Sequence, residues 1–74
     1  PHDWRTESFA VSHLSLDRTR DSDGDERYRL LAHGAKSFGV GSALNDPGDL
    51  LHVGRWLAAR LDVRFDAPKG VADD

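Results

Sequence analysis

The sequence predicts a small α+β domain: a β-hairpin and a third strand form an antiparallel sheet, and one C-terminal amphipathic helix packs on one face. Three observations support this: two runs of alternating apolar and polar residues, a polar turn between them, and one stretch with helical apolar spacing. A chain of 74 residues favours a single domain. We expect a polar lead-in over residues 1–7, the domain over 8–65 and a disordered tail or linker over 66–74.

The predicted hairpin consists of two strands, Ser8–Leu16 and Arg27–His33, joined by the polar loop Asp17–Glu26. Side chains alternate between the two faces of a strand, so each strand has one mainly apolar face. The residues of these apolar faces are Ala10, Leu14 and Leu16 in the first strand and Tyr28, Leu30 and Ala32 in the second.

A short third strand is predicted after Gly34, through Phe38 and Val40. Gly39 and Gly41 alternate with these two apolar residues. Glycine inside a strand often marks a β-bulge or a close backbone approach, and we expect one of these here.

The helix is predicted from Pro47 to Leu61. Asp46 suits the N-cap, Pro47 the first helical position, and Asp49 the first turn. The apolar stripe expected to face the sheet is Leu50, Val53, Leu57 and Leu61. A short final strand is then expected around Val63 and Phe65.

Composition excludes several classes of function. The net charge is −3, from 10 basic and 13 acidic side chains, which argues against a nucleic-acid-binding domain. The absence of cysteine excludes disulfides, thiolate metal sites and thiol nucleophiles. No apolar run is long enough to span a bilayer. Asp exceeds Glu 11 to 2 and Arg exceeds Lys 8 to 2, a composition that favours a bacterial source of high G+C content. Because the first residue is Pro1, we expect this chain to be a piece of a longer protein.

The acidic loop resembles a calcium-binding loop only in part. With Gly24 at the sixth position of an EF-hand, Thr19 would be first and Leu30 twelfth, and neither supplies the required carboxylate. We therefore interpret the loop as a solvated turn and leave weak divalent binding open. Its carboxylates are Asp21, Asp23 and Asp25.

The histidines do not predict a metal or catalytic site. None of the four has another at metal-ligand spacing on one helix, although His13 and His33 could face each other across the hairpin. Ser12 should point away from His13, and Ser15 has no identifiable carboxylate to orient a catalytic pair. We expect no enzyme activity and no cofactor. The two remaining histidines are His2 and His52.

Trp56 is the strongest candidate for a partner contact. It lies outside the centre of the predicted apolar stripe, with Arg60 four residues on, and aromatic and arginine side chains are enriched at protein interfaces. The alternative is that Trp56 covers the edge of a small core. Arg27 and Arg29 share a strand face and could pair with the acidic loop or meet an anionic headgroup. Exposed sheet edges also allow a homodimer, through the third strand or the Trp56 side of the helix.

Three segments of the C-terminal half carry a resemblance: Phe38–Gly41, Leu44–Pro47 and Arg55–Leu61. They are similar to the last strand and closing helix of soluble PH-like domains in uncharacterised bacterial membrane proteins. The resemblance covers residues 27–62, and a complete PH-like barrel has more strands than this chain can supply. It implies a water-facing module beside a membrane that binds a protein or a lipid headgroup, with no catalytic residues.

Two functions follow as hypotheses. The first is a non-enzymatic interaction module, the soluble portion of a larger and membrane-anchored bacterial protein, in the cytoplasm or at the cytoplasmic face of the inner membrane. The second is a small acidic cytosolic regulator, an inhibitor or antitoxin-like protein, whose acidic loop binds a basic protein partner, because complementary charge speeds association.

Overall fold

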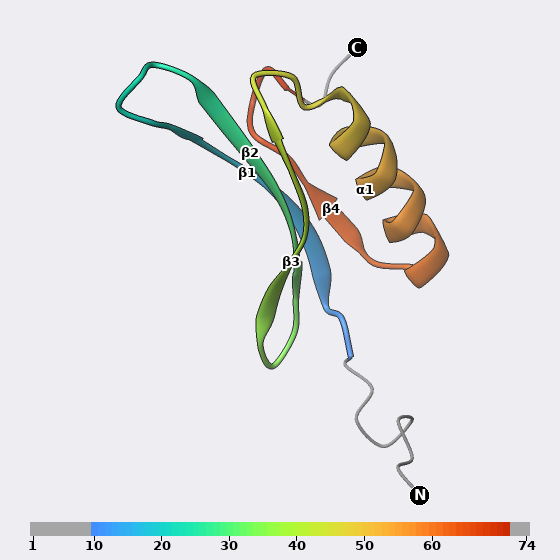
Figure 1. The fold of residues 1–74 in the computed structure, drawn as a ribbon. Coiled ribbons are helices and arrows are strands. Elements are labelled where there is room, and N and C mark those ends of the chain that lie inside the picture. The colour runs from blue at the N-terminus through green and yellow to red at the C-terminus, as the bar shows by residue number, and fades with distance from the viewer. Residues whose placement is uncertain (1–9, 72–74) are drawn as a thin grey trace, which may run out of the picture.

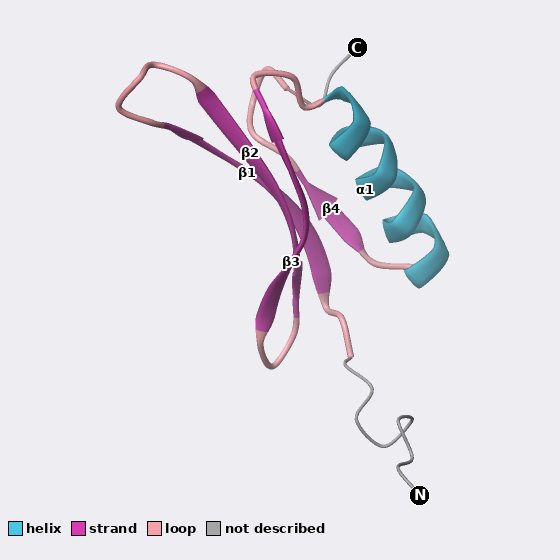
Figure 2. Ribbon diagram, in the orientation of Figure 1, coloured by secondary structure: helices cyan, strands magenta, loops and turns pink. Residues whose placement is uncertain are grey.

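The computed structural model describes residues 10–71, in which one helix packs on one face of a four-stranded sheet. The elements follow in the order β1 (His13–Arg20), β2 (Glu26–His33), β3 (Ser37–Leu44), α1 (Gly48–Leu61) and β4 (Arg64–Asp66) (Figure 1). The strand order is β3-β2-β1-β4. The first three strands are antiparallel, and β4 runs parallel to β1. The predicted α+β class is confirmed, including the short final strand (Figure 2).

The hairpin is longer than predicted and its loop is shorter. β1 and β2 pair along their whole length, so residues 17–20 belong to β1 and the turn covers only residues 21–25. The prediction of a loop over Asp17–Glu26 was wrong because this end of β1 is exposed and carries only polar side chains, which do not show the apolar alternation of a strand. The predicted start at Ser8 lies outside the described residues, and β1 begins at His13.

The apolar faces of the hairpin form the core, as predicted from their alternation. All five side chains of β1 and β2 that were expected to point inward are at most 4% exposed, whereas Ala10, which precedes β1, is exposed. The buried five are Leu14, Leu16, Tyr28, Leu30 and Ala32.

β3 pairs with β2 and contains the irregularity that its glycines predict. Leu30 lies opposite Gly41 and Leu31 lies opposite Gly39, so Val40 is the extra residue of a β-bulge. Gly41 also permits a close approach, since a Cβ there would lie 3.1 Å from Cδ2 of the helical residue Leu50.

The helix starts one residue later than predicted. Pro47 takes the N-cap position that was assigned to Asp46, and Gly48 is the first helical residue. Asp46 still satisfies a free donor, because its Oδ1 accepts the Gly48 N–H at 3.0 Å. Asp49 lies in the first turn and Arg60 in the last, where each side chain complements the helix dipole.

The buried face of α1 differs from the predicted stripe. The residues buried against the sheet are Leu50, Gly54 and Ala58, whereas Val53 and Leu61 are 41% and 44% exposed. The expectation that Val53 and Leu61 face the sheet was therefore wrong. The line of close contact runs along i, i+4, i+8 through two small residues and not along the largest apolar side chains.

Gly54 explains this rotation of the helix. A Cβ at Gly54 would lie 2.6 Å from Phe65 Cε1 and 3.2 Å from Leu30 Cδ1, distances at which the neighbouring atoms must move. The small Ala58, one turn later, packs with Leu14 in the same way. Small residues on this line let the helix axis approach the sheet and β4 closely.

After α1, the part of the chain that packs against the core extends further than expected. Phe65 of β4 packs against both core clusters, and Ala67 and Val71, which the sequence assigns to the tail, pack against one of them. Residues 72–74 and the lead-in 1–7 lie outside the described residues. No helix in the described part of the chain is long and apolar enough to cross a membrane.

Candidate functional site

Trp56 and Arg60 contact each other on the solvent side of α1. Trp56 is 57% exposed, so its ring does not cover the core. The Arg60 guanidinium carbon lies 5.2 Å from the centroid of the indole ring, a cation–π geometry. Helical spacing of i and i+4 brings the two side chains together, as the sequence predicted. The arrangement presents a large aromatic surface and a neighbouring guanidinium to solvent.

A third exposed side chain extends this pair along the helix. Val53, 41% exposed, lies one turn before Trp56 and on the same side of the helix as Arg60. We call Val53, Trp56 and Arg60 the α1 flank. The sequence missed Val53 as a surface residue because its apolar character and spacing favoured the core.

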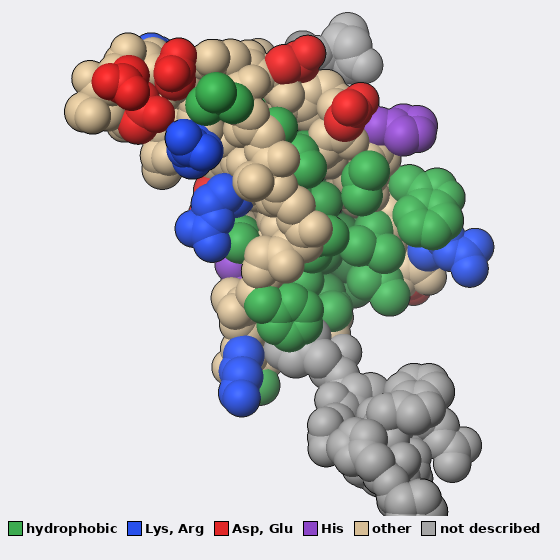
Figure 3. Space-filling view, in the orientation of Figure 1, with side chains coloured by type: hydrophobic (Ala, Val, Ile, Leu, Met, Phe, Trp, Pro, Cys, Tyr) green, Lys and Arg blue, Asp and Glu red, His purple; other side chains and the backbone are tan. Residues whose placement is uncertain are grey.

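The edge strand β3 supplies a second exposed apolar surface. Phe38, Val40 and Leu44 are 48%, 44% and 49% exposed. Figure 3 shows hydrophobic side chains gathered on the side of the molecule that carries both β3 and α1. Large contiguous apolar surfaces on small soluble proteins mark binding sites.

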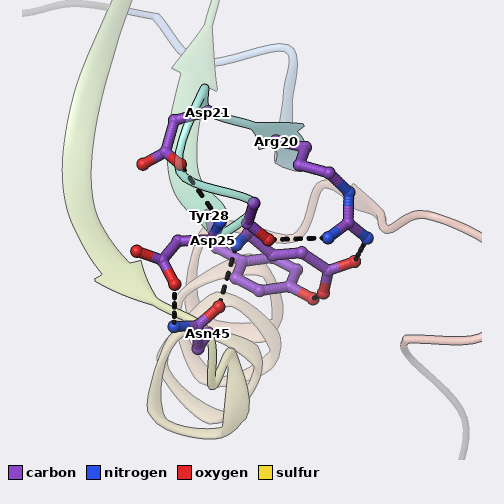
Figure 4. Close-up of polar contacts among 7 residues, drawn as sticks. Arg20, Asp21, Asp25, Tyr28 and Asn45 are labelled. Carbon is purple, nitrogen blue, oxygen red and sulfur yellow. Dashed lines mark hydrogen bonds and ion pairs between the residues drawn. The ribbon is translucent and has the colours of Figure 1, made fainter.

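The acidic loop is held by its own carboxylates. Asp21 Oδ1 accepts the backbone N–H groups of Asp23 and Asp25 at 3.0 and 3.1 Å. Asp25 Oδ1 accepts a hydrogen bond of 3.1 Å from the side chain of Asn45, which follows β3 (Figure 4). Arg27 lies 3.5 Å from Asp21 Oδ2, so the predicted pairing of this arginine with the loop is confirmed.

These contacts define what the loop can do with a cation. One carboxylate oxygen from each of the three aspartates lies within 4.8 Å of the others. Two of the three, Asp21 and Asp25, already accept hydrogen bonds that shape the turn, and Asp23 is exposed. The EF-hand positions Thr19 and Leu30 lie in β-strands. The geometry is that of a self-supported turn with an acidic surface.

The base of the loop is closed by further polar contacts (Figure 4). Arg20 pairs with Glu26 at 2.7 Å and donates to the Gly24 carbonyl at 2.7 Å. The Tyr28 hydroxyl donates to the other oxygen of Glu26 at 2.7 Å. This hydrogen bond, followed by burial, raises the pKa of Tyr28 above its usual value of 10.

The sheet face opposite the helix carries the two hairpin histidines. The rings of His13 and His33 stack, with centroids 4.5 Å apart and planes 14° from parallel. Ser15 Oγ lies 2.7 Å from His33 Nε2, and Ser37 Oγ lies 2.8 Å from His33 Nδ1. The expectation that Ser12 cannot reach His13 was wrong, since its Oγ lies 3.0 Å from His13 Nδ1.

The polarity of this network does not favour a nucleophile. The Ser15 hydroxyl donates to Asp17 Oδ1 at 3.1 Å, which supplies a carboxylate that the sequence reading did not identify. A hydroxyl has one proton, so with that proton directed to Asp17 the contact with His33 Nε2 requires the imidazole to donate. General-base activation of a serine needs the opposite direction. These contacts hold the serine and histidine side chains in place on the sheet face opposite the helix. The exposed α1 flank and β3 therefore remain as the candidate site.

Comparisons with protein-family models, with curated proteins and with solved structures found no match for this chain. The resemblance of residues 27–62 to PH-like domains therefore stays a prediction. The candidate site rests on the geometry of the described residues: an aromatic–guanidinium pair on the helix and an exposed apolar strand at the sheet edge.

Proposed function

We propose that this domain is a non-enzymatic protein-interaction module that docks a partner protein on the α1 flank. The observation that carries the proposal is Trp56, which is 57% exposed and stacked under Arg60. Trp and Arg are the residue types most enriched among the side chains that dominate binding energy. A stacked pair has also lost part of its conformational freedom before binding, which lowers the entropic cost of docking.

Burial elsewhere in the fold supports the same proposal. Gly54 and Ala58 make the close contact with the sheet, so the fold does not use the indole ring for its core. An exposed indole that stabilises little in the free domain is available for a partner. The neighbouring Val53 adds apolar area to the same side of the helix.

The acidic regulator has weaker support. Its binding surface would be the loop Asp21–Asp25, where Asp21 and Asp25 are engaged in contacts that hold the turn. Of the three aspartates only Asp23 is exposed and has a side chain without such a contact among the described residues. A basic partner would therefore meet less free negative charge than the composition of the loop indicates.

Site-specific photo-crosslinking in the source cells tests the proposal. A photoreactive amino acid in place of Trp56 should give a discrete crosslinked band that contains a second protein. The matched control is the same amino acid in place of Thr19, which is exposed in β1 and away from the α1 flank. Equal bands from both positions, or none from Trp56, would overturn the proposal.

A further inference from the structure

The outer edge of β3 is a strand-pairing surface without an occupant in the described part of the chain. β3 is eight residues long and pairs on one side only, with β2. Natural proteins protect such edges with charged side chains, proline, short strands or bulges. β3 has no charged residue and no proline, and the bulge at Val40 is its single protective feature.

The two ends of β3 carry opposite charges that form no ion pair within residues 10–71. Lys36 directly precedes the strand, and its side chain forms no ion pair in this range. Asp46 follows shortly after the strand. One of its oxygens accepts the Gly48 N–H, and the carboxylate forms no ion pair among the described residues. A ligand that suits this edge is extended and uncharged, with an acidic end near Lys36 and a basic end near Asp46.

A second copy of β3 in antiparallel orientation meets all of these requirements. We propose that two copies of this chain pair along β3 about a two-fold axis and form one continuous eight-stranded sheet. The two-fold places Lys36 of each copy near Asp46 of the other, so both ends are attractive. A parallel arrangement would place like charges together. This interface is separate from the α1 flank and does not depend on the function proposed for that flank.

The bulge determines the register. Phe38 pairs with Ala32, and Ala43 pairs with Tyr28. Both of these β2 residues are buried on the helix side of the sheet. Phe38 and Ala43 therefore share that side, although their spacing along the chain is odd. Residues opposite each other in an antiparallel pair lie on the same face. The axis between Val40 and Gly41 therefore sets Phe38 of one copy against Ala43 of the other, a large side chain against a small one, with both helices on one face of the joined sheet.

The first experiment is sedimentation equilibrium of the full chain from roughly 1 µM to 1 mM, a range that covers weak interfaces. We expect a concentration-dependent rise from the monomer mass of 8.2 kDa to twice that value. Lys36→Glu places two acidic groups at each end of the interface and should weaken the dimer about tenfold, because each surface pair contributes ~0.2–1 kcal/mol and both pairs change sign. The swap K36E/D46K should restore it.

A covalent test does not depend on these charges or on the hydrogen bond that Asp46 accepts from the Gly48 N–H. The chain has no cysteine, so Val40→Cys introduces one thiol beside the proposed axis. Mild oxidation should give a disulfide-linked dimer. The control Ala59→Cys, on the exposed side of α1, should stay monomeric.

Three outcomes would overturn the proposal: a monomer at every concentration, a dimer that K36E leaves unchanged, or a disulfide that forms through A59C and not through V40C. A dimer with no Trp56-dependent partner would overturn only the proposed function. A crosslinked partner at Trp56 with a monomeric chain would overturn only the β3 dimer.

Discussion

At one edge of the sheet β4 contributes three residues, and its charged side chains Arg64 and Asp66 pair with each other at 2.9 Å. At the other edge β3 contributes eight residues, none of them charged. The short edge lies next to the line where α1 packs closely, through Phe65 against Gly54. The long edge has glycine at two positions and exposes Phe38 and Val40. Among residues 10–71, the β4 edge is short and charged, whereas the β3 edge is long, uncharged and without a second paired strand.

In this small fold, the side chains that stabilise the core differ from those that we propose to bind a partner. The most deeply buried contacts lie on β1 and β2, where Leu14 and Leu30 are completely buried. Exposed apolar area at β3 and the α1 flank contributes little to folding but can be buried by a partner. A domain of 74 residues has little stability to spare, and the apolar groups outside its core are the ones that we propose for partner binding.

The largest difference in the free energy of unfolding is expected between truncation of an apolar side chain beside β4 and truncation of one on β3. Leu14→Ala removes a completely buried side chain beside β4 and should lower the free energy of unfolding by about 2–5 kcal/mol, which is most of the stability of so small a domain. Val40→Ala, at a 44% exposed position of β3, should cost about 0.5 kcal/mol. Urea unfolding followed by circular dichroism measures both. Similar losses for the two variants would contradict the comparison.

The same comparison can be made by adding a side chain at a glycine, one on α1 and one on β3. Gly54→Val introduces a Cβ 2.6 Å from the Phe65 ring and should destabilise the fold by about 1–3 kcal/mol. Gly39→Val introduces a side chain where nothing lies within 4 Å, and it replaces glycine with a good strand former. The expected result is a Tm below that of the parent for Gly54→Val and at or above it for Gly39→Val, in thermal melts of dilute samples. A higher Tm for Gly54→Val would disprove the close helix–sheet contact.

The same two glycines show what the sequence can and cannot predict. Alternation along the hairpin identified the buried side chains correctly, because that pattern depends only on the local strand geometry. The orientation of α1 depends on how closely the helix approaches Phe65 and Leu30, which the spacing of large apolar residues does not contain. Gly54 and Ala58, four residues apart, were the signal that could have predicted it.

The candidate site was predicted in part. Trp56 and Arg60 contact each other because i, i+4 spacing is a local property of a helix. The exposure of Val53 follows from the orientation of α1. The unequal edges of the sheet depend on strand order, because the parallel pairing of β4 with β1 brings together segments far apart in the chain. The acidic side chains of the hairpin loop were visible in the sequence, but their use as acceptors within the turn was not.

The strand next to the open edge provides a pH-dependent test. The pKa of Tyr28 is raised above 10 by its hydrogen bond to Glu26 and by burial, so the folded state holds this proton more tightly than the unfolded state. The stability from this contact is complete below about pH 10 and is lost as the pH rises through the folded pKa. The free energy of unfolding should therefore fall as the pH rises above about 10, and Tyr28→Phe should reduce the decline.

Absorbance of tyrosinate measures the same event directly, since the chain has one tyrosine. Titration of the folded chain should give a midpoint above that of the unfolded chain in denaturant. Equal midpoints would show that the Tyr28–Glu26 contact is absent in solution.

A small effect on stability is also expected at the α1 flank. Trp56→Ala removes a side chain that is 57% exposed and its contact with Arg60, which at an exposed site contributes about 0.5–1 kcal/mol. The free energy of unfolding should fall by no more than this, and the amide NMR spectrum should stay dispersed. Leu57→Ala, on the half-buried side of the same helix, is the matched control and should cost more. Collapse of the spectrum for Trp56→Ala would assign the indole to the core, whereas a preserved fold that no longer binds its partner is the result that an exposed docking residue requires.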